Sequence, residues 1–101
     1  MKASIDGTVV AEAPDSDLIK IEGNYYFPPS ALDADAFSDS QTPYNCPWKG
    51  DAQYHDVSVA GATHHDAAWS YPRPYPASFK RVGQDYTGYV AFDKRQVTIA
   101  G

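Results

Sequence analysis

The sequence contains very little cysteine. Cys46 is the only cysteine among 101 residues, so an internal disulfide and a cysteine-rich zinc site are both excluded. A chain without disulfides suits a reducing compartment. The first ten residues, MKASIDGTVV, lack the apolar segment of a signal peptide. We therefore expect a cytoplasmic protein.

Basic segments and long apolar runs are also missing. The formal net charge is −5, and the basic residues form doublets such as Lys80-Arg81 and Lys94-Arg95. An acidic surface repels nucleic-acid phosphates, and anionic lipid attracts longer basic runs than these. No segment approaches the ~18 apolar residues that a membrane-spanning helix needs. We expect neither nucleic acid nor a membrane as a partner.

Motifs for common cofactors and metals are absent. The phosphate-loop, dinucleotide-binding, nucleophile-elbow and H-E-x-x-H patterns do not occur. His64, His65 and Asp66, with His55, are metal-binding residue types, but adjacent strand residues point to opposite faces. We interpret AGATHHD, residues 60–66, as a solvated loop. The sequence predicts no cofactor and no metal site.

What the chain does contain is short β-type runs separated by tight turns. Aromatic residues make up 14% of the chain, eight of them tyrosines, and they favour strands. Asp6-Gly7 is a strong hairpin signal, and the turn residues Glu22-Gly23-Asn24 separate two further strands. The predicted strands are residues 2–5, 8–13, 17–21, 25–27, 67–72, 89–92 and 97–100, together with two strands between Cys46 and Val59.

One short helix is predicted over Ser30 to Phe37, after two prolines that favour a helix start. Residues 38–43 are predicted as a loop and residues 73–78 as a proline-rich connection, and the last two strands as a hairpin. Residues 1–101 are therefore expected to form a single small domain of mainly β class. The expected architecture is antiparallel and tent-like or barrel-like, with one short helix.

The segment CPWKG, residues 46–50, is predicted to form the turn of a central hairpin. If Lys49-Gly50 is a two-residue turn, Cys46 lies opposite Gln53. Gln53, His55 and Val57 then share the inward face with Cys46, and Tyr54 takes the other face unless a bulge intervenes.

This register makes Cys46 and His55 diagonal neighbours on one face, ~7–8 Å apart. A nucleophile and its base need ~2.6–3.2 Å between heavy atoms, so the spacing by itself does not make a catalytic dyad. The other interpretation is a cysteine that packs in the interior beside a hydrogen-bonded histidine.

Lys49 also has two interpretations. Its ammonium group could hold an anion, with Trp48, Trp69 and Tyr71 as aromatic walls. Alternatively, Lys49 is a solvated turn lysine, and the aromatic residues belong to the core.

Four stretches of the sequence together resemble a known family. They are VVAEAPDSDLIKIEGNYYFPPSAL, TPYNCPWKGDAQYHDV, AAWSYPRPYPASFKRVGQDYTGYVAF and DKRQVTI. In order and spacing they resemble the domain-of-unknown-function family numbered 427, and Cys46 to Gly50 is the most specific part. The resemblance implies a small β-tent related in shape to zinc-bearing folds, whose paired C-x-x-C ligands this chain lacks. It implies no established activity.

The function predicted from the sequence is a binding module for a small molecule, with an anionic ligand as one option, in a cleft around the Cys46–Gly50 hairpin. One alternative is an enzyme in which Cys46 is the nucleophile or redox centre, assisted by His55 or Lys49. A second is a protein-interaction scaffold. A monomer or weak homo-oligomer is expected. The predicted ligand-binding residues are Cys46, Trp48, Lys49, Tyr54, His55, Trp69 and Tyr71.

Overall fold

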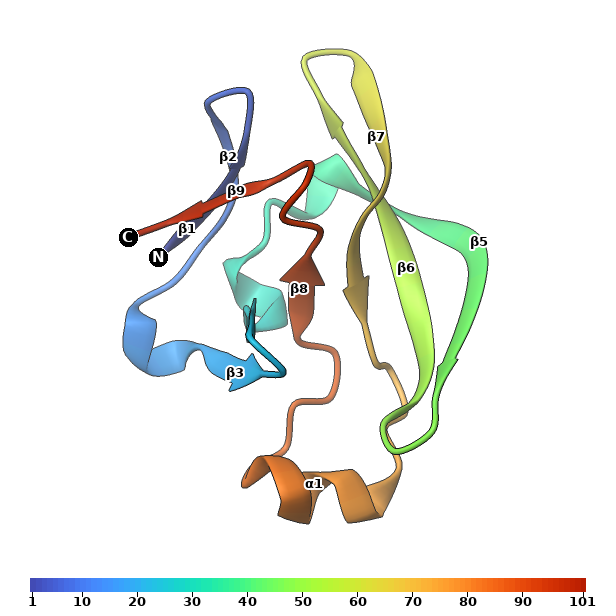
Figure 1. Cartoon of the computed structure of the whole chain (residues 1–101). Coiled ribbons are helices and arrows are strands. Elements are labelled where there is room, and N and C mark those ends of the chain that lie inside the picture. Colours follow the sequence, from blue (N-terminus) through green and yellow to red (C-terminus); the bar gives the residue numbers. More distant parts are fainter.

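The computed structural model describes residues 1–101 as three antiparallel sheets and one α-helix (Figure 1). The first sheet has the order β2-β1-β9, the second pairs β3 with β4, and the third has the order β5-β6-β7-β8. The mainly β, antiparallel prediction is confirmed, and the sheets do not close into a barrel. The strands are β1 (Lys2–Ile5), β2 (Thr8–Glu12), β3 (Ile19–Ile21), β4 (Asn24–Tyr26), β5 (Phe37–Cys46), β6 (Gly50–Val59), β7 (Ala62–Ser70), β8 (Val90–Phe92) and β9 (Thr98–Ala100).

The predicted turns at Asp6-Gly7 and Glu22-Gly23 are confirmed. Asp6 and Gly7 join β1 to β2 with φ of 48° and 82°. Glu22 and Gly23 join β3 to β4 with φ of 53° and 82°. Positive φ at both central residues is the signature of a type I′ turn, which matches the twist of the flanking strands. The second turn places Glu22 at the tip of its hairpin.

The predicted helix over residues 30–37 is wrong. The chain there forms two 3-10 turns, Pro29–Ala31 and Ala34–Ala36, and Phe37 already begins β5. Pairing of Leu32 with Ala11 interrupts any longer helix. The α-helix is instead α1 (Pro76–Val82), within and beyond the predicted proline-rich connection. Prolines favour a helix start as well as an extended linker, and Gly83 at φ 96° ends this helix.

Three further expectations are corrected. Residues 38–43 lie inside β5, an edge strand that tolerates Pro43 and bulges away from β6. Most of residues 60–66 belong to β7, which follows an Ala60-Gly61 turn. The last two strands do not pair with each other, because β8 joins β7 and β9 joins β1. A third 3-10 turn lies at Asp15–Asp17.

The four-stranded sheet has a hydrophobic core on each face. Neighbouring residues of β8 alternate between them, since Phe92 contributes to one core and Ala91 to the other. We call the first the main core; its buried residues are Ala3, Ile5, Val10, Ala11, Ala13, Phe27, Val57, Val59, Ala67, Ala68, Val90, Phe92 and Val97. We call the second the aromatic core; its buried residues are Ile19, Ile21, Tyr26, Cys46, Tyr71, Tyr86 and Ala91.

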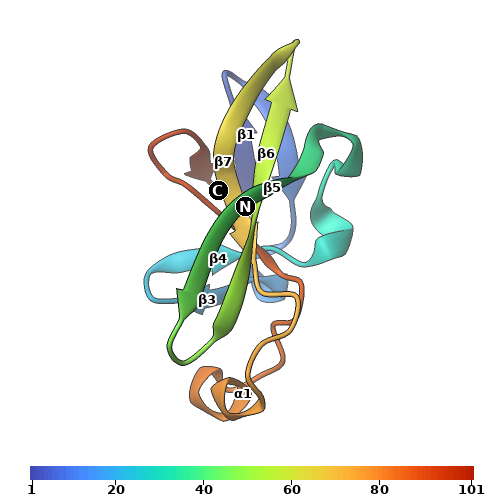
Figure 2. The ribbon, with the colours of Figure 1, turned by 90° about the vertical axis from the view of Figure 1, so that its right-hand side faces the viewer.

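The arrangement of the other elements follows from these two cores. The β1, β2 and β9 sheet supplies residues to the main core, and the β3-β4 hairpin supplies residues to the aromatic core. Figure 2 shows α1 at the end of the molecule near the tip of the β5-β6 hairpin. The α1 side chain Phe79 packs at 5.8 Å from the Tyr86 ring, and Tyr86 donates a hydrogen bond to Ser78 (2.8 Å). None of the helices is long and apolar enough to cross a membrane.

Candidate functional site

The central hairpin exists, but its turn and register differ from the prediction. Cys46 lies opposite Gly50, so the loop has three residues, Pro47 to Lys49. Gly50 adopts φ 110°, and a Cβ there would lie 3.3 Å from the Arg73 carbonyl oxygen. Lys49 accepts a hydrogen bond from the Tyr75 backbone N–H (2.9 Å). Glycine at the end of the loop therefore lets the segment before α1 pack directly on the hairpin.

This register exchanges the two faces of β6. An odd shift in pairing moves alternate side chains to the opposite face of a sheet. Cys46 consequently shares its face with Ala52 and Tyr54, which contact the aromatic core or its neighbours. His55 lies on the other face with Val57, a main-core residue. The prediction that Cys46 and His55 share a face is wrong, and Tyr54 takes the place expected for His55.

The structure does not support a Cys46–His55 dyad. Gly50, opposite Cys46, is five residues from His55, roughly 16 Å along a strand. His55 Nε2 is 2.9 Å from Ser70 Oγ and its Nδ1 is 3.3 Å from an Asp39 carboxylate oxygen. Burial lowers the pKa of His55, against the opposing effect of Asp39. Cys46 is 5% exposed, as expected for a cysteine that packs in the interior.

Lys49 is buried, so its interpretation as a solvated turn lysine is wrong. The residue is 4% exposed, although it belongs to a hairpin loop. Its Nζ forms an ion pair with the Glu22 carboxylate and lies 4.8 Å from the Trp48 ring centroid and 5.1 Å from the Tyr71 centroid. A carboxylate and two aromatic faces thus replace the water that an ammonium group loses on burial.

The Lys49 side chain lines a cavity of about 310 Å³ between the β3-β4 hairpin and the four-stranded sheet. Tyr54 and Trp69 pair across β6 and β7, with ring centroids 6.2 Å apart. The Trp69 indole N–H donates to the Tyr26 hydroxyl oxygen at 3.1 Å. We call this space the Lys49 cavity; it is lined by Glu22, Asn24, Tyr26, Tyr44, Lys49, Tyr54, Trp69 and Tyr71.

Three tyrosine hydroxyls of this cavity, those of Tyr26, Tyr54 and Tyr71, remain neutral above the usual pKa of tyrosine. Burial raises the pKa of Tyr26 to about 12, although the hydrogen bond from Trp69 opposes the shift. Burial also raises the pKa of Tyr71 and that of Tyr54. The Lys49 cavity therefore offers tyrosine O–H groups beside the Lys49–Glu22 ion pair.

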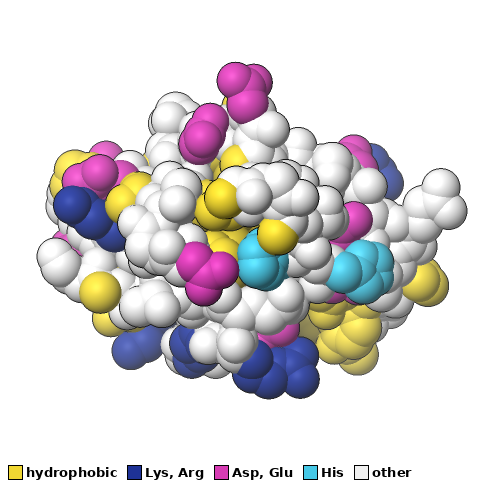
Figure 3. All heavy atoms as spheres, turned by 90° about the horizontal axis from the view of Figure 1, so that it is seen from above, with side chains coloured by type: hydrophobic (Ala, Val, Ile, Leu, Met, Phe, Trp, Pro, Cys, Tyr) yellow, Lys and Arg dark blue, Asp and Glu magenta, His cyan; other side chains and the backbone are white.

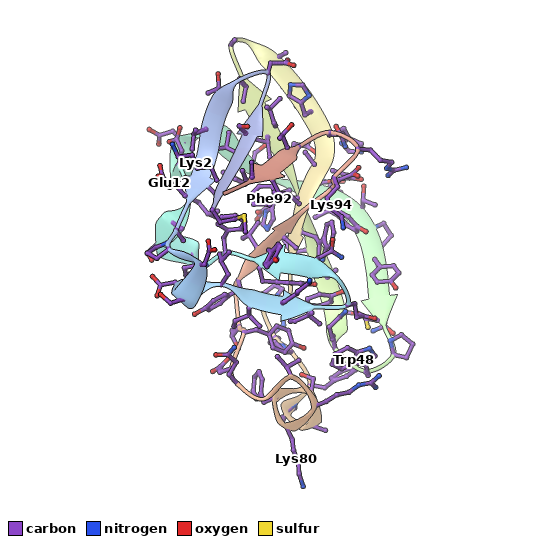
Figure 4. The ribbon with its side chains drawn as sticks, turned by 60° about the vertical axis from the view of Figure 1, so that its left-hand side comes forward. Lys2, Glu12, Trp48, Lys80, Phe92 and Lys94 are labelled. Atoms are coloured by element: carbon purple, nitrogen blue, oxygen red, sulfur yellow. The ribbon has the colours of Figure 1, made fainter.

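Four of the seven sequence-predicted ligand-binding residues line the Lys49 cavity: Lys49, Tyr54, Trp69 and Tyr71. Trp48 contacts the ammonium group without lining the cavity, and the Arg81 guanidinium also lies 4.2 Å from its ring centroid. Cys46 and His55 do not line the cavity. Figure 4 shows Trp48 near the hairpin tip, above α1.

Sequence reasoning missed Glu22, Asn24, Tyr26 and Tyr44 as cavity residues. Glu22 was recognised as a turn residue, but its partner lies 27 residues away in another hairpin. Tyr44 lies in β5, before the start of the strand predicted from Cys46. The signal available in the sequence was its eight tyrosines. A buried tyrosine hydroxyl usually needs a hydrogen-bond partner, so many tyrosines in a small domain indicate a polar region beside the core.

Comparison with known proteins identifies the family. The model of the family described as a domain of unknown function, DUF427, matches residues 1–100. The chain belongs to the DUF427 family. No curated protein matches this chain. The resemblance noted in the sequence is confirmed, and the Lys49 cavity is a feature of this DUF427 domain for which the family description gives no role.

A wider groove continues from the Lys49 cavity of this DUF427 domain. Its volume is about 670 Å³, and it shares Asn24, Tyr44, Tyr54 and Trp69 with the cavity. Beyond these residues it is lined by Thr42, Pro43, His65, Asp66, Phe92, Asp93, Lys94, Arg95 and Gln96. Asp93 and Arg95 form an ion pair (3.0 Å), and hydrogen bonds from Arg95 lower the pKa of Asp93 to about 2.

Asp56, His65 and Asp66 form the other cluster of titratable groups. His65 Nδ1 lies 2.8 Å from Asp56 Oδ1, and His65 Nε2 lies 3.2 Å from Asp66 Oδ2. Figure 3 shows histidine side chains beside acidic ones on the face seen from above. Both ring nitrogens are directed at carboxylate oxygens, so His65 links Asp56 of β6 to Asp66 of β7. The absence of a metal site stays a prediction.

Proposed function

We propose that this DUF427 domain is a binding module for a small molecule that carries a flat ring and an anionic group, held in the Lys49 cavity. The observation that carries the proposal is a buried ammonium group at the wall of a cavity lined mainly by aromatic rings. Binding sites of this kind combine apolar rings with a small number of placed polar groups.

The aromatic lining supports a flat ring as part of the ligand. Tyr26 and Trp69 meet edge to face at 6.5 Å, and Tyr54 adds a tilted ring. Such rings hold one another in fixed orientations and offer faces and edges to a further ring. A volume of about 310 Å³ suits a ligand with one ring and a short substituent.

The exposure of Glu22 supports the anionic group. The Glu22 side chain is 56% exposed, whereas that of Lys49 is 5% exposed. Glu22 can therefore move into solvent at little cost, but Lys49 must keep a partner because an unpaired buried ammonium is strongly unfavourable. A ligand carboxylate or phosphate can take the position of the Glu22 carboxylate beside Lys49.

A thermal-shift screen followed by titration tests the proposal. The panel contains benzoate, nicotinate, mononucleotides, aliphatic acids and neutral sugars. We expect ring-bearing anions to raise the midpoint of unfolding. The Lys49→Met variant should bind the best of them at least about tenfold more weakly, as for loss of a charged hydrogen bond.

Lys80→Met is the matched control, because Lys80 is exposed on α1 and directed away from the domain (Figure 4). It should bind like the wild type. Glu22→Gln should bind the anion more tightly, since it removes the competing carboxylate. A panel without any stabilising ligand, or equal affinity of Lys49→Met and wild type, would refute the role of Lys49.

The two alternative functions lack a comparable observation. Cys46 is buried, does not line the Lys49 cavity and lies far from His55 along β6, which disfavours the cysteine enzyme. Tyr44 and Tyr75 are 50% and 45% exposed, but they are isolated side chains rather than a continuous apolar surface. Oligomeric state and cytoplasmic location stay predictions.

A further inference from the structure

Lys49 differs from the four other lysines of the chain. Lys2, Lys20, Lys80 and Lys94 are all exposed, whereas Lys49 is 4% exposed and lines a cavity. Figure 4 shows Lys80 extending into solvent. A lysine that is removed from water can act as a nucleophile once its ammonium group gives up a proton, and the Glu22 carboxylate beside it is a group that can accept that proton.

We propose that Lys49 captures the carbonyl group of a small aromatic aldehyde or ketone as a protonated imine in the Lys49 cavity. The inference rests on the proposed function, since it places the ligand in the same cavity, but it adds a reaction class. It makes the domain a reversible covalent binder of carbonyl compounds.

The reaction balances without any other reagent. Glu22 accepts a proton from the Lys49 ammonium, and the free amine attacks the carbonyl carbon, forming a C–N bond while the π electron pair of the carbonyl moves to oxygen. A proton then passes from the new nitrogen to that oxygen, which gives a neutral carbinolamine. Glu22 returns its proton to the carbinolamine oxygen, the C–O bond breaks and water leaves. The ammonium and carbonyl become a protonated imine and water, with no change in net charge.

The surroundings of Lys49 suit the product as well as the starting ammonium. A protonated imine carries the same single positive charge at nearly the same position. The Glu22 carboxylate and the Trp48 and Tyr71 rings, whose centroids are 4.8 and 5.1 Å from Nζ, therefore stabilise it in the same way. Because Lys49 is positively charged both as the ammonium and as the protonated imine, the surrounding groups need not rearrange between reactant and product.

Glu22 is the group that provides the proton transfers. Glu22 contacts Nζ on one side and is 56% exposed, so it exchanges protons and water with solvent. The Tyr71 ring centroid lies 5.1 Å from Nζ, and burial raises the pKa of the Tyr71 hydroxyl, which therefore stays neutral beside the cation. The carbonyl substituent of the ligand would lie against Tyr54 and Trp69, with the wider groove open to a longer group.

The test uses benzaldehyde with sodium cyanoborohydride, which reduces an imine to a stable secondary amine. Peptide mapping by mass spectrometry then measures the adduct at each lysine of the intact, folded chain. Despite its burial, Lys49 should react at least about tenfold faster than Lys2 or Lys80. If the exposed lysines form adducts and Lys49 remains unmodified, the proposal is overturned, and the Lys49–Glu22 ion pair has only a structural role.

Glu22→Gln should slow adduct formation at Lys49 by about 100-fold through loss of the proton-transfer group. Glu12→Gln is the matched control, because Glu12 lies 3.9 Å from Lys2 in an exposed pair (Figure 4). It should leave the Lys49 rate unchanged. Equal rates in Glu22→Gln and Glu12→Gln would contradict the assigned role of Glu22, and circular dichroism checks that both variants fold.

Benzoate separates this inference from the proposed function. It should protect Lys49 from benzaldehyde if both occupy the Lys49 cavity. If benzoate binds but Lys49 gives no adduct, the imine proposal fails and the binding proposal stands. If Lys49 gives the adduct but no anion binds, the anionic-ligand proposal fails and the imine proposal stands.

Discussion

The two cores on opposite faces of one sheet are built from different chemistry. The main core contains small aliphatic residues and two phenylalanines, and none of its buried members is polar. The aromatic core contains three buried tyrosines, the buried cysteine and, at its margin, Trp48, Trp69 and Phe79. The buried Lys49 lies against this second core, with its ammonium beside Trp48 and Tyr71.

The comparison teaches where a small domain can place a site. Small branched side chains interdigitate and fill space, so the main core chiefly provides stability. Rigid rings that meet edge to face, with hydroxyls and an ammonium group that need partners, leave room between them. The Lys49 cavity lies on the aromatic side for this reason, and substitutions should separate the two roles.

The largest expected effect is on the main core. Phe92 is 2% exposed and meets the rings of Phe27 and Phe37 at 5.5 and 6.1 Å. Phe92→Ala should lower the free energy of unfolding by about 3–5 kcal/mol, measured by urea denaturation. Val9→Ala, at a site 40% exposed, is the control and should change it by less than about 0.5 kcal/mol. A similar small change for both would mean that the main core does not dominate stability.

The next largest effect tests how tightly the segment before α1 packs on Gly50 of the β5-β6 hairpin. Gly50→Ala should cost about 1–3 kcal/mol, since φ is 110° and the new Cβ would press on the Arg73 carbonyl at 3.3 Å. Gly61→Ala shares the positive φ, at 81°, but meets no atom within 4 Å. It should cost less than Gly50→Ala in the same thermal melt. If the two variants melt together, packing of the segment before α1 on Gly50 contributes nothing.

A third effect appears only in alkali. Burial raises the pKa of Tyr26 to about 12 and also raises that of Tyr54, Tyr71 and Tyr86, above the ~10 of an unfolded tyrosine. A raised pKa in the folded state gives stability that is complete below pH 10 and is lost as the pH rises through the folded values. Absorbance at 295 nm should show a late group of tyrosines that ionises together with unfolding.

Phenylalanine at position 26 provides the control for this titration. Tyr26→Phe should remove one late-ionising group and weaken the loss of stability above pH 10. All eight tyrosines ionising near pH 10 in the folded protein would contradict the burial of these hydroxyls.

The smallest effect on stability is expected for Lys49→Met, the substitution that should weaken ligand binding most. Lys49→Met keeps the apolar stem and leaves Glu22, which is 56% exposed, free to enter solvent. The free energy of unfolding should change by less than about 1 kcal/mol, because no buried charge is left unpaired. A loss of several kcal/mol in a urea melt would show that Lys49 is chiefly structural.

Local sequence signals predicted some elements well and others poorly. Asp6-Gly7 and Glu22-Gly23 specify their turns because few residue pairs accept positive φ at both positions. Residues 30–37 have a helical pattern but are tied to β2 through Leu32 and Ala11. The prolines at 74 and 76 fit an extended linker and a helix start equally well, and contact of Phe79 with Tyr86 favours the helix.

The sequence by itself determined the mainly antiparallel class, two of the hairpin turns and the family. These depend on alternation and turn chemistry, which act over a few residues. Only the tertiary structure decided the register of the Cys46–Gly50 hairpin, the burial of Lys49 and its pairing with Glu22. Each depends on contacts between distant segments, and a shift of an odd number of residues is enough to exchange Tyr54 for His55 at the site.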